Sequence, residues 1–251
     1  MVNVETEKDF ALALVKAFDS NKGLFSKKVN VENWVPQNAA DLVKALFLFF
    51  VVQLDYATKS QKLYEGATSL LEKNPKFFDP NNILSLSDNE LLEVCVKYLK
   101  PRYPNEASLR LKINAKKLIN EYSGNPIEIL DSSKNAKEAL KRILEFRGYG
   151  PKTGNLFLRS MVSIFNTPFD DIEDILPPVD IHDVRIAYLL GFIDSTDMTE
   201  KNILRTKKLW NNVCKVAGVN WITFDRALWL LGSEGHPKSK QEIIKLLETA
   251  G

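Results

Sequence analysis

The chain has 251 residues, 45% of them hydrophobic, which is enough for one large core or two small ones. Its 34 Lys and Arg side chains nearly balance 32 Asp and Glu side chains, and the net charge of +2 excludes a histone-like polycation. Two cysteines, Cys95 and Cys214, exclude a four-cysteine iron–sulfur cluster, and neither has a Cys or His neighbour at metal-ligand spacing. Any binding of nucleic acid would therefore depend on a local basic surface.

The same features bear on where the protein works. Free cysteines favour a reducing, intracellular compartment, either the cytoplasm or the nucleoid of a prokaryote. The first turns carry Glu5, Glu7, Lys8 and Asp9, unlike a secretory signal. The most apolar run, residues 45–54, is far shorter than the roughly 20 residues that span a bilayer. We expect a soluble chain with no membrane partner.

Helical periodicity recurs along the chain, whereas convincing strand alternation does not. We expect helices near residues 10–18, 42–51, 63–71, 87–99, 107–121, 133–144 and 221–231 and 239–249, and further helices after Pro151, Asp180 and Thr199. The second is apolar on several sides and should be central. A capping box begins the fourth at Ser87, and Gly218 is a plausible left-handed end for the helix after Thr199. These patterns predict an all-α protein of about ten helices.

Two short segments carry the chemistry. Phe146-Arg147-Gly148-Tyr149-Gly150-Pro151-Lys152-Thr153-Gly154 places two glycines between helices, where the backbone can turn tightly and approach a phosphate. Pro151 suits the first position of the second helix, and Lys152 then stands where the helix dipole disfavours its positive charge. Downstream, Pro178-Val179-Asp180-Ile181-His182 supplies a carboxylate. A lysine, a carboxylate and exposed N–H groups together suggest amine-based chemistry on a nucleic acid.

This order of motifs resembles the helix-hairpin-helix superfamily of DNA glycosylases. Those enzymes carry Pro-Gly-Val-Gly-x-Lys-Thr-Ala followed by Val-Asp-x-His-x-x-Arg-Val. Here Arg147 replaces the usual proline and Gly154 the usual alanine, and the second motif aligns without a gap from Val179 to Ile186. The match covers about residues 135–190.

The resemblance implies a role for each matching residue. The N–H groups of Gly148 and Gly150, with Thr153 and the helix N-terminus, would hold a DNA phosphate. Lys152 would attack C1′ of the damaged nucleotide and form a Schiff base, which allows β-elimination. Asp180 would assist, and it could equally cap the following helix.

Alternatives remain open at these positions. Asp183 could be the working carboxylate if the register shifts, and His182 is interpreted as a structural hydrogen-bonding residue. Lysine in a first helical turn is otherwise usually a solvated surface residue.

Further residues point to one branch of the superfamily. Lysine disfavours the members that only hydrolyse, and the missing cysteine cluster disfavours the endonuclease III-like branch, which leaves the 8-oxoguanine group. Phe224-Asp225-Arg226-Ala227-Leu228-Trp229 resembles a helix of the archaeal 8-oxoguanine glycosylases, in which Asp225 and Trp229 would line the base pocket. The alternative places Trp229 in the core and pairs Asp225 with Arg226 or a lysine.

Gln53 resembles a residue that fills the gap left by the extruded base, or it caps a helix.

The resemblance also implies an architecture. We expect a two-lobed helical fold with the helix-hairpin-helix (about residues 134–164) at a cleft that DNA enters. One lobe would combine residues 1–36 and 180–251, and the other would be residues 37–179. Residues 166–178 hold three prolines and Asp170, Asp171, Glu173 and Asp174; we interpret them as a surface insertion pointing away from DNA.

These observations predict a function in base-excision repair: a monomeric bifunctional glycosylase and AP lyase that removes 8-oxoguanine from double-stranded DNA. No organic cofactor or catalytic metal is expected, although a monovalent cation at the hairpin would fit the family. The alternatives are a glycosylase for another base or nucleoside lesion, and a noncatalytic DNA-binding module.

Overall fold

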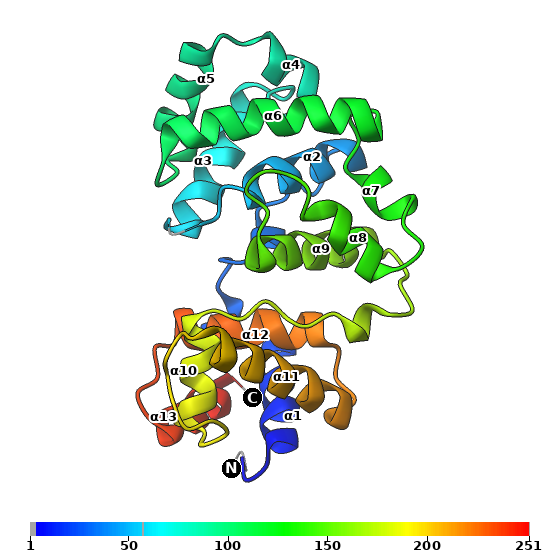
Figure 1. Ribbon diagram of the computed structural model, residues 1–251. Coiled ribbons are helices and arrows are strands. Elements are labelled where there is room, and N and C mark those ends of the chain that lie inside the picture. The colour runs from blue at the N-terminus through cyan, green and yellow to red at the C-terminus, as the bar shows by residue number, and fades with distance from the viewer. Residues whose placement is uncertain (1–3, 57, 251) are drawn as a thin grey trace. The chain divides into compact units, whose positions relative to one another are not determined.

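The computed structural model describes residues 4–56 and 58–250, and within them it contains thirteen α-helices and no strand (Figure 1). The all-α prediction is therefore confirmed. None of the helices in these residues combines the length and apolar character needed to cross a bilayer.

The chain divides into two compact units. The terminal unit combines Met1–Lys28 with Glu173–Gly251, and the central unit is Val29–Ile172. We had placed these boundaries at 36/37 and 179/180. The observed first boundary comes earlier because Val31 and Val35 are buried and Glu32 pairs with Arg159, all within the central unit. The observed second boundary also comes earlier because the Glu173 carbonyl accepts a hydrogen bond from Asn211 of the terminal unit.

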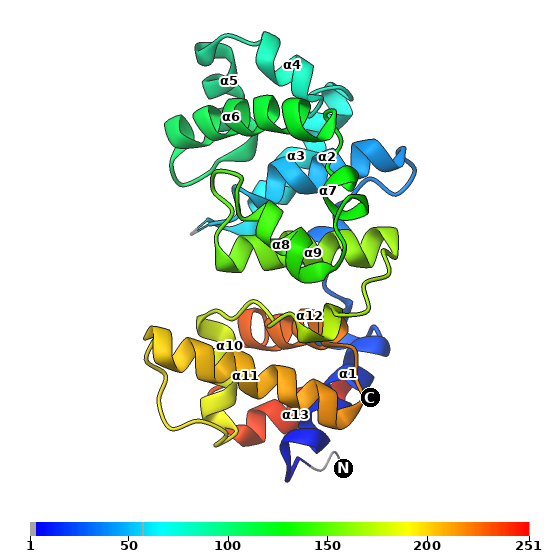
Figure 2. The same cartoon turned by 45° about the vertical axis from the view of Figure 1, so that its right-hand side comes forward.

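The terminal unit is a cluster of helices around an aromatic core. Its elements are α1 (Glu7–Asp19), η1 (Gly23–Ser26), α10 (Ile181–Leu189), α11 (Glu200–Ala217), α12 (Trp221–Ser233) and α13 (Lys240–Ala250). Helix α1 packs against α11, α12 and α13, which joins the two ends of the chain (Figure 2). Phe10 lies at the centre, with ring centroids 5.8 Å from Trp210 and 6.2 Å from Phe224.

The central unit carries the glycine hairpin. Its elements are η2 (Val31–Asn33), α2 (Asp41–Val52), α3 (Ser60–Lys73), α4 (Pro80–Ser85), α5 (Asp88–Val94), η3 (Cys95–Leu99), α6 (Pro104–Tyr122), α7 (Ile127–Asp131), α8 (Ala136–Ile143) and α9 (Pro151–Phe165). Every side chain of α2 from Ala45 to Val52 is buried, as its apolar pattern predicted. Helix α9 packs on α2, and α8 packs on α9 (Figure 1).

Several predicted helix ends are confirmed in detail. The Ser87 hydroxyl accepts from the Glu90 N–H, and the Glu90 carboxylate accepts from the Ser87 N–H. Gly218 ends α11 with φ +66°. The short helices α4 and α7 were not predicted, because six and five residues are too few for a clear apolar period. The helix we expected to reach Leu99 changes into the π-helix η3 at Cys95.

The segment of residues 166–178 straddles the change of unit. It contains one short helical turn, η4 (Ile172–Asp174). Asp171 accepts from the backbone N–H groups of Ala136 and Lys137 and so caps α8, while Asp174 pairs with Lys215. Two of the four carboxylates that we assigned to a surface insertion thus hold helices in place.

Candidate functional site

The hairpin between α8 and α9 is anchored in the core by its aromatic residues. Phe146 and Tyr149 are almost fully buried, and the centroid of the Phe146 ring lies 5.0 Å from that of Phe49 on α2. The Tyr149 hydroxyl donates to the Phe49 carbonyl at 2.6 Å. Between these anchors Gly148 adopts φ +89°, a conformation that L side chains rarely take. The turn is therefore rigid at both ends.

Thr153 holds the second half of the hairpin in shape. Its hydroxyl accepts from the Gly150 N–H at 3.0 Å and donates to the Gly148 carbonyl at 3.2 Å. We had expected the N–H of Gly150 and Thr153 itself to contact a DNA phosphate; both are already engaged inside the hairpin. Among the described residues, the Gly148 N–H donates no hydrogen bond inside the hairpin. Of the two glycine N–H groups, that of Gly148 is therefore the one that a phosphate could accept from.

An ion-pair network fastens the hairpin to α6. Arg147, which stands where the family has proline, makes a two-pronged contact with Glu106, at 3.0 Å from Nε and 3.1 Å from Nη2. Arg110 lies 3.6 Å from the same carboxylate and donates from Nη1 to the Gln53 carbonyl at 2.7 Å. A Cβ on Gly148 would come within 2.4 Å of Arg110. Glycine is favoured at this position by its positive φ, and a side chain there would also displace the end of Arg110.

Lys152 is the second residue of α9 and its side chain is exposed. It lines a surface hollow of about 380 Å³ together with the hairpin residues 148–153, Tyr56 and Arg110. Sequence reasoning missed Tyr56 and the Arg147–Glu106–Arg110 network. An exposed tyrosine four residues after an apolar helix was a weak signal. The Glu106–Arg110 pair lies within one turn of α6, but Arg147 is 41 residues from Glu106.

Gln53 does not take the position we expected of a gap-filling residue. It is fully buried, and its Nε2 donates to the Phe49 carbonyl at 3.2 Å. Its Oε1 accepts from Asn114 at 2.6 Å, and Asn114 also bonds both the N–H and the carbonyl of Arg147. The amide of Gln53 thus ties α2 to α6 and the hairpin. Gln53 is the C-cap residue of α2, as the alternative interpretation predicted, and its side chain would have to leave this network before it could enter DNA. The gap-filling role stays a prediction.

In the terminal unit, Asp180 is the N-cap of α10. Its Oδ1 accepts from the His182 N–H at 2.8 Å, while Oδ2 of Asp183 accepts from the Asp180 N–H at 2.7 Å. The two alternatives for the working carboxylate thus belong to one capping box. Asp183 is 3% exposed, whereas Asp180 is half-buried.

His182 packs tightly within the terminal unit. A Cβ on Gly232 would lie 2.8 Å from the His182 Cβ, so α10 and α12 approach closely there. Arg185 donates to the Gly232 carbonyl, and its Nη2 lies 3.5 Å from Nδ1 of His182. These contacts agree with the structural interpretation of His182.

Asp225 and Trp229 lie one turn apart on α12. Asp225 is 4% exposed and Trp229 is half-buried. Burial, and then the charges of Glu173 and Asp225, raise the pKa of the Cys214 thiol on α11. The guanidinium of Arg226 lies 5.4 Å from the ring centroid of Phe18.

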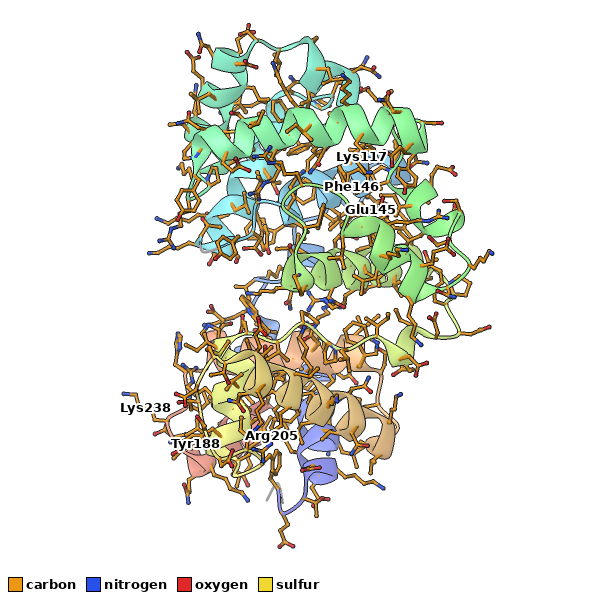
Figure 3. The ribbon with its side chains drawn as sticks, viewed as in Figure 1. Lys117, Glu145, Phe146, Tyr188, Arg205 and Lys238 are labelled. Atoms are coloured by element: carbon orange, nitrogen blue, oxygen red, sulfur yellow. The ribbon has the colours of Figure 1, made fainter. Side chains whose placement is uncertain are left out.

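Most basic side chains near the hairpin are paired within the protein. Lys117 lies 2.8 Å from Glu121 and 3.4 Å from Glu145, and its Nζ is 5.3 Å from the ring centroid of Phe146 (Figure 3). The hydrogen bond from Lys117 to Glu121 raises the pKa of this ammonium. Lys112 forms an ion pair with Asp88. These lysines contribute little to a phosphate-binding surface.

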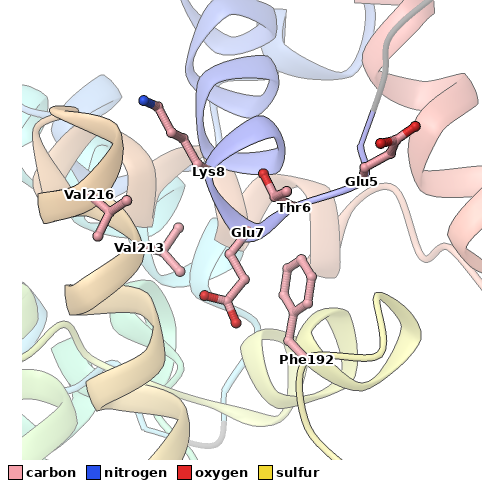
Figure 4. A pocket seen from close by; sticks show the side chains of 7 residues that line it. All are labelled: Glu5, Thr6, Glu7, Lys8, Phe192, Val213 and Val216. Carbon is pink, nitrogen blue, oxygen red and sulfur yellow. The ribbon is translucent and has the colours of Figure 1, made fainter.

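The terminal unit has another hollow of about 400 Å³ (Figure 4). Glu5, Thr6, Glu7 and Lys8 line one side, and Phe192, Val213 and Val216 line the other. Two carboxylates against one lysine make it a poor phosphate site. Among the described residues there is no group of three or more His, Cys, Asp or Glu side chains that could hold a metal ion.

No family model matches this sequence, and no curated protein does. Solved structures match its fold. Endonuclease III trapped covalently on DNA matches with a TM-score of 0.61 and 16% identity, covering 95% of this chain and 92% of its own. An 8-oxoguanine DNA glycosylase from Pyrobaculum aerophilum matches with a TM-score of 0.60 and 17% identity, covering 99% of this chain and 98% of its own. The 8-oxoguanine DNA glycosylase of Methanocaldococcus jannaschii matches with a TM-score of 0.57 and 17% identity, covering 88% of this chain and 93% of its own.

The fold is that of the helix-hairpin-helix DNA glycosylases. The likeness extends over nearly the whole chain rather than the hairpin alone. A thermostable thymine-DNA glycosylase and the Methanocaldococcus 8-oxoguanine DNA glycosylase both match with a TM-score of 0.57, so the fold does not choose among substrates. Substrate and reaction must be argued from side chains.

Proposed function

We propose that this protein is a DNA glycosylase with AP lyase activity and that the amine of Lys152 carries the reaction. The observation that carries this proposal is the placement of Lys152. An exposed lysine stands on the first turn of α9, beside a rigid hairpin whose Gly148 amide remains available for a phosphate. The helix dipole disfavours an ammonium at this position, which favours the neutral amine that a nucleophile requires.

The chemistry needs only this amine and a carboxylate. The lysine nitrogen bonds to C1′ as the glycosidic bond breaks, and the base leaves with the bonding electrons and a proton. Opening of the sugar ring then gives a Schiff base between C1′ and Lys152. Loss of a proton from C2′ expels the phosphate at C3′, which is β-elimination. No organic cofactor or catalytic metal takes part in these steps.

We assign the assisting carboxylate to Asp180 rather than Asp183. Asp180 is half-buried and so keeps part of its side chain open to solvent, whereas Asp183 is buried in the first turn of α10. The N-cap bond to His182 fixes the Asp180 side chain without neutralising it. Asp180 would stabilise the positive charge that develops on the sugar.

The proposed substrate is oxidised guanine, with 8-oxoguanine the first to test. This base carries a hydrogen on N7, where guanine has an acceptor. A carboxylate such as Asp225 can accept that hydrogen, and Trp229 one turn away offers a ring for stacking. This step is supported by the spacing of the two residues and by the partial exposure of Trp229; Asp225 is buried and would need the pocket to open before it could contact a base.

Borohydride trapping on a duplex with one 8-oxoguanine tests the reaction. The wild type should form a covalent adduct and Lys152→Gln should not. Lys141→Gln, which alters an exposed lysine on α8, is the matched control and should trap normally. An adduct with Lys152→Gln would remove this lysine from its role. Binding to DNA without trapping by the wild type would favour the noncatalytic alternative.

Two further comparisons complete the test. Asp180→Asn should bind DNA but lose base excision, whereas Asp183→Asn should keep excision because its amide oxygen can still accept from the Asp180 N–H. The reverse result would move the assignment to Asp183. A panel of duplexes with single alkylated, deaminated or oxidised bases separates the possible substrates. We further propose that the protein is a monomer and works in an intracellular compartment. We also propose that the hairpin carbonyls bind a monovalent cation.

A further inference from the structure

A second, smaller hollow adjoins the one beside Lys152. Tyr56 and Arg110 line both, and the second is completed by residues of the segment that precedes α6, among them Arg102 and Tyr103. All of these residues belong to the central unit. A continuous surface, the stacking strip, therefore runs from the hairpin to the start of α6. We define it by Tyr56, Arg102, Tyr103 and Arg110.

Two large aromatic rings of this strip face solvent. Tyr56 is 65% exposed and Tyr103 is 56% exposed, although tyrosine usually buries most of its ring. The guanidinium of Arg102 lies 5.4 Å from the centroid of the Tyr103 ring. This cation–π contact places a positive charge beside a ring that is more than half exposed, and the exposed part of the ring is open to a flat ligand.

The backbone fixes where Tyr103 stands. The π-helix η3 ends at Leu99, its C-cap residue Lys100 adopts φ +47°, and Pro101 follows. Gly66 of α3 packs directly on this turn, because a Cβ on Gly66 would lie 1.8 Å from the Tyr98 carbonyl oxygen. Irregular turns of this kind are often kept at functional sites. The exposed ring is thus presented by a constrained turn and not by a loose loop.

The charge of the strip suits a polyanion. Arg102 and Arg110 contribute two positive charges. Glu106 is the carboxylate that lines the smaller hollow, and it is matched by Arg147 and Arg110. Aromatic rings between arginines bind nucleic acid by stacking on bases and by attracting the backbone.

We propose that Tyr103, supported by Tyr56, stacks on an unpaired nucleobase of the DNA held at the hairpin. The inference rests on the proposed function, since extrusion of a damaged base leaves a base without its partner. Every nucleobase presents a π-face, so the strip would accept any of the four. Extrusion leaves one base unpaired in the opposite strand, and it also uncovers a face of each base beside the gap in the damaged strand; the experiment separates stacking on the two.

The probe is a duplex that contains a tetrahydrofuran abasic-site analogue, which cannot form a Schiff base. One arm places 2-aminopurine beside the analogue in the same strand, and the other places it opposite the analogue. Tyr103→Ala should weaken binding to these duplexes by about 5- to 150-fold, the range for loss of one stacked base. Binding to a fully paired duplex should change little. Quenching of 2-aminopurine by the wild type in one arm identifies the strand.

Matched variants separate stacking from other effects. Tyr103→Phe keeps the ring and should bind as the wild type, whereas Tyr103→Leu should behave like Tyr103→Ala. Tyr188→Ala, which removes an exposed tyrosine of α10, is the control and should bind normally (Figure 3). Thermal melting of each variant checks that it is folded.

The outcomes distinguish this inference from the function on which it rests. If the wild type traps with borohydride but Tyr103→Ala and Tyr56→Ala bind every duplex as the wild type does, stacking is refuted and the enzyme remains. Equal loss on paired and unpaired duplexes, or no quenching in either arm, also refutes it. If trapping fails while Tyr103-dependent binding persists, the strip stands and the proposed reaction does not.

Discussion

Replacing Gly148 by alanine should destabilise the hairpin strongly. A residue with a Cβ at φ +89° is strained by about 1–3 kcal/mol. The new methyl group would also lie 2.4–2.5 Å from Cδ, Nε and Nη1 of Arg110. The arginine end can move, so the relevant cost is its bond to the Gln53 carbonyl, about 1.5–3 kcal/mol for a charged donor. We expect a total loss of about 3–5 kcal/mol.

Gly150→Ala is the matched control within the same turn. Gly150 has φ −106°, and nothing lies within 4 Å of a Cβ placed on it. Its replacement should change stability by about 1 kcal/mol or less, with a stabilising sign, because alanine restricts the unfolded chain. Urea unfolding followed by far-UV circular dichroism gives both free energies, provided that the slopes with denaturant agree.

A double-mutant cycle isolates the contribution of Arg110. In an Arg110→Ala background, Gly148→Ala meets no guanidinium and should cost only the backbone strain. The reasoning is refuted if Gly148→Ala is no more destabilising than Gly150→Ala. An unchanged cost in the Arg110→Ala background would refute the arginine part alone.

Two further predictions concern buried polar groups. Asn114→Ala removes three hydrogen bonds, to the Gln53 side chain and to the N–H and carbonyl of Arg147, and should lower the free energy of unfolding by about 2–4 kcal/mol; a urea midpoint equal to that of the wild type would contradict it. Burial lowers the pKa of Lys207, so its charged form is penalised in the folded state below that pKa. Lys207→Met should therefore raise the melting temperature at pH 7, and the gain should shrink as the pH approaches about 10, where the unfolded lysine also loses its proton. A gain that is constant across this range would exclude a charge effect.

Local sequence patterns were sufficient for most of the helices and for the turn chemistry. The capping box at Ser87, Pro151 at the first position of α9 and the left-handed Gly218 all act through neighbours within a few residues. Such contacts can be recognised from spacing alone. The π-helix η3 could not, because it differs from an α-helix in its hydrogen bonds and not in its apolar period.

Long-range contacts decided the roles of particular side chains. Gln53 ends an apolar helix and looks surface-directed in the sequence, yet Asn114, 61 residues away, supplies a buried partner for its amide. Thr153 and Gly150 look available to a phosphate until their mutual hydrogen bond is seen. Arg147, a departure from the family motif, is explained by Glu106 on α6.

By itself the sequence determined the all-helical class, the glycine-bent hairpin and the identity of the lysine and aspartate that the proposed chemistry needs, because these depend on residue types at short spacing. The tertiary structure alone decided which of those groups remain accessible. Burial and hydrogen-bond partners come from segments far apart along the chain, and they determine whether a polar side chain holds the fold together or can meet a substrate.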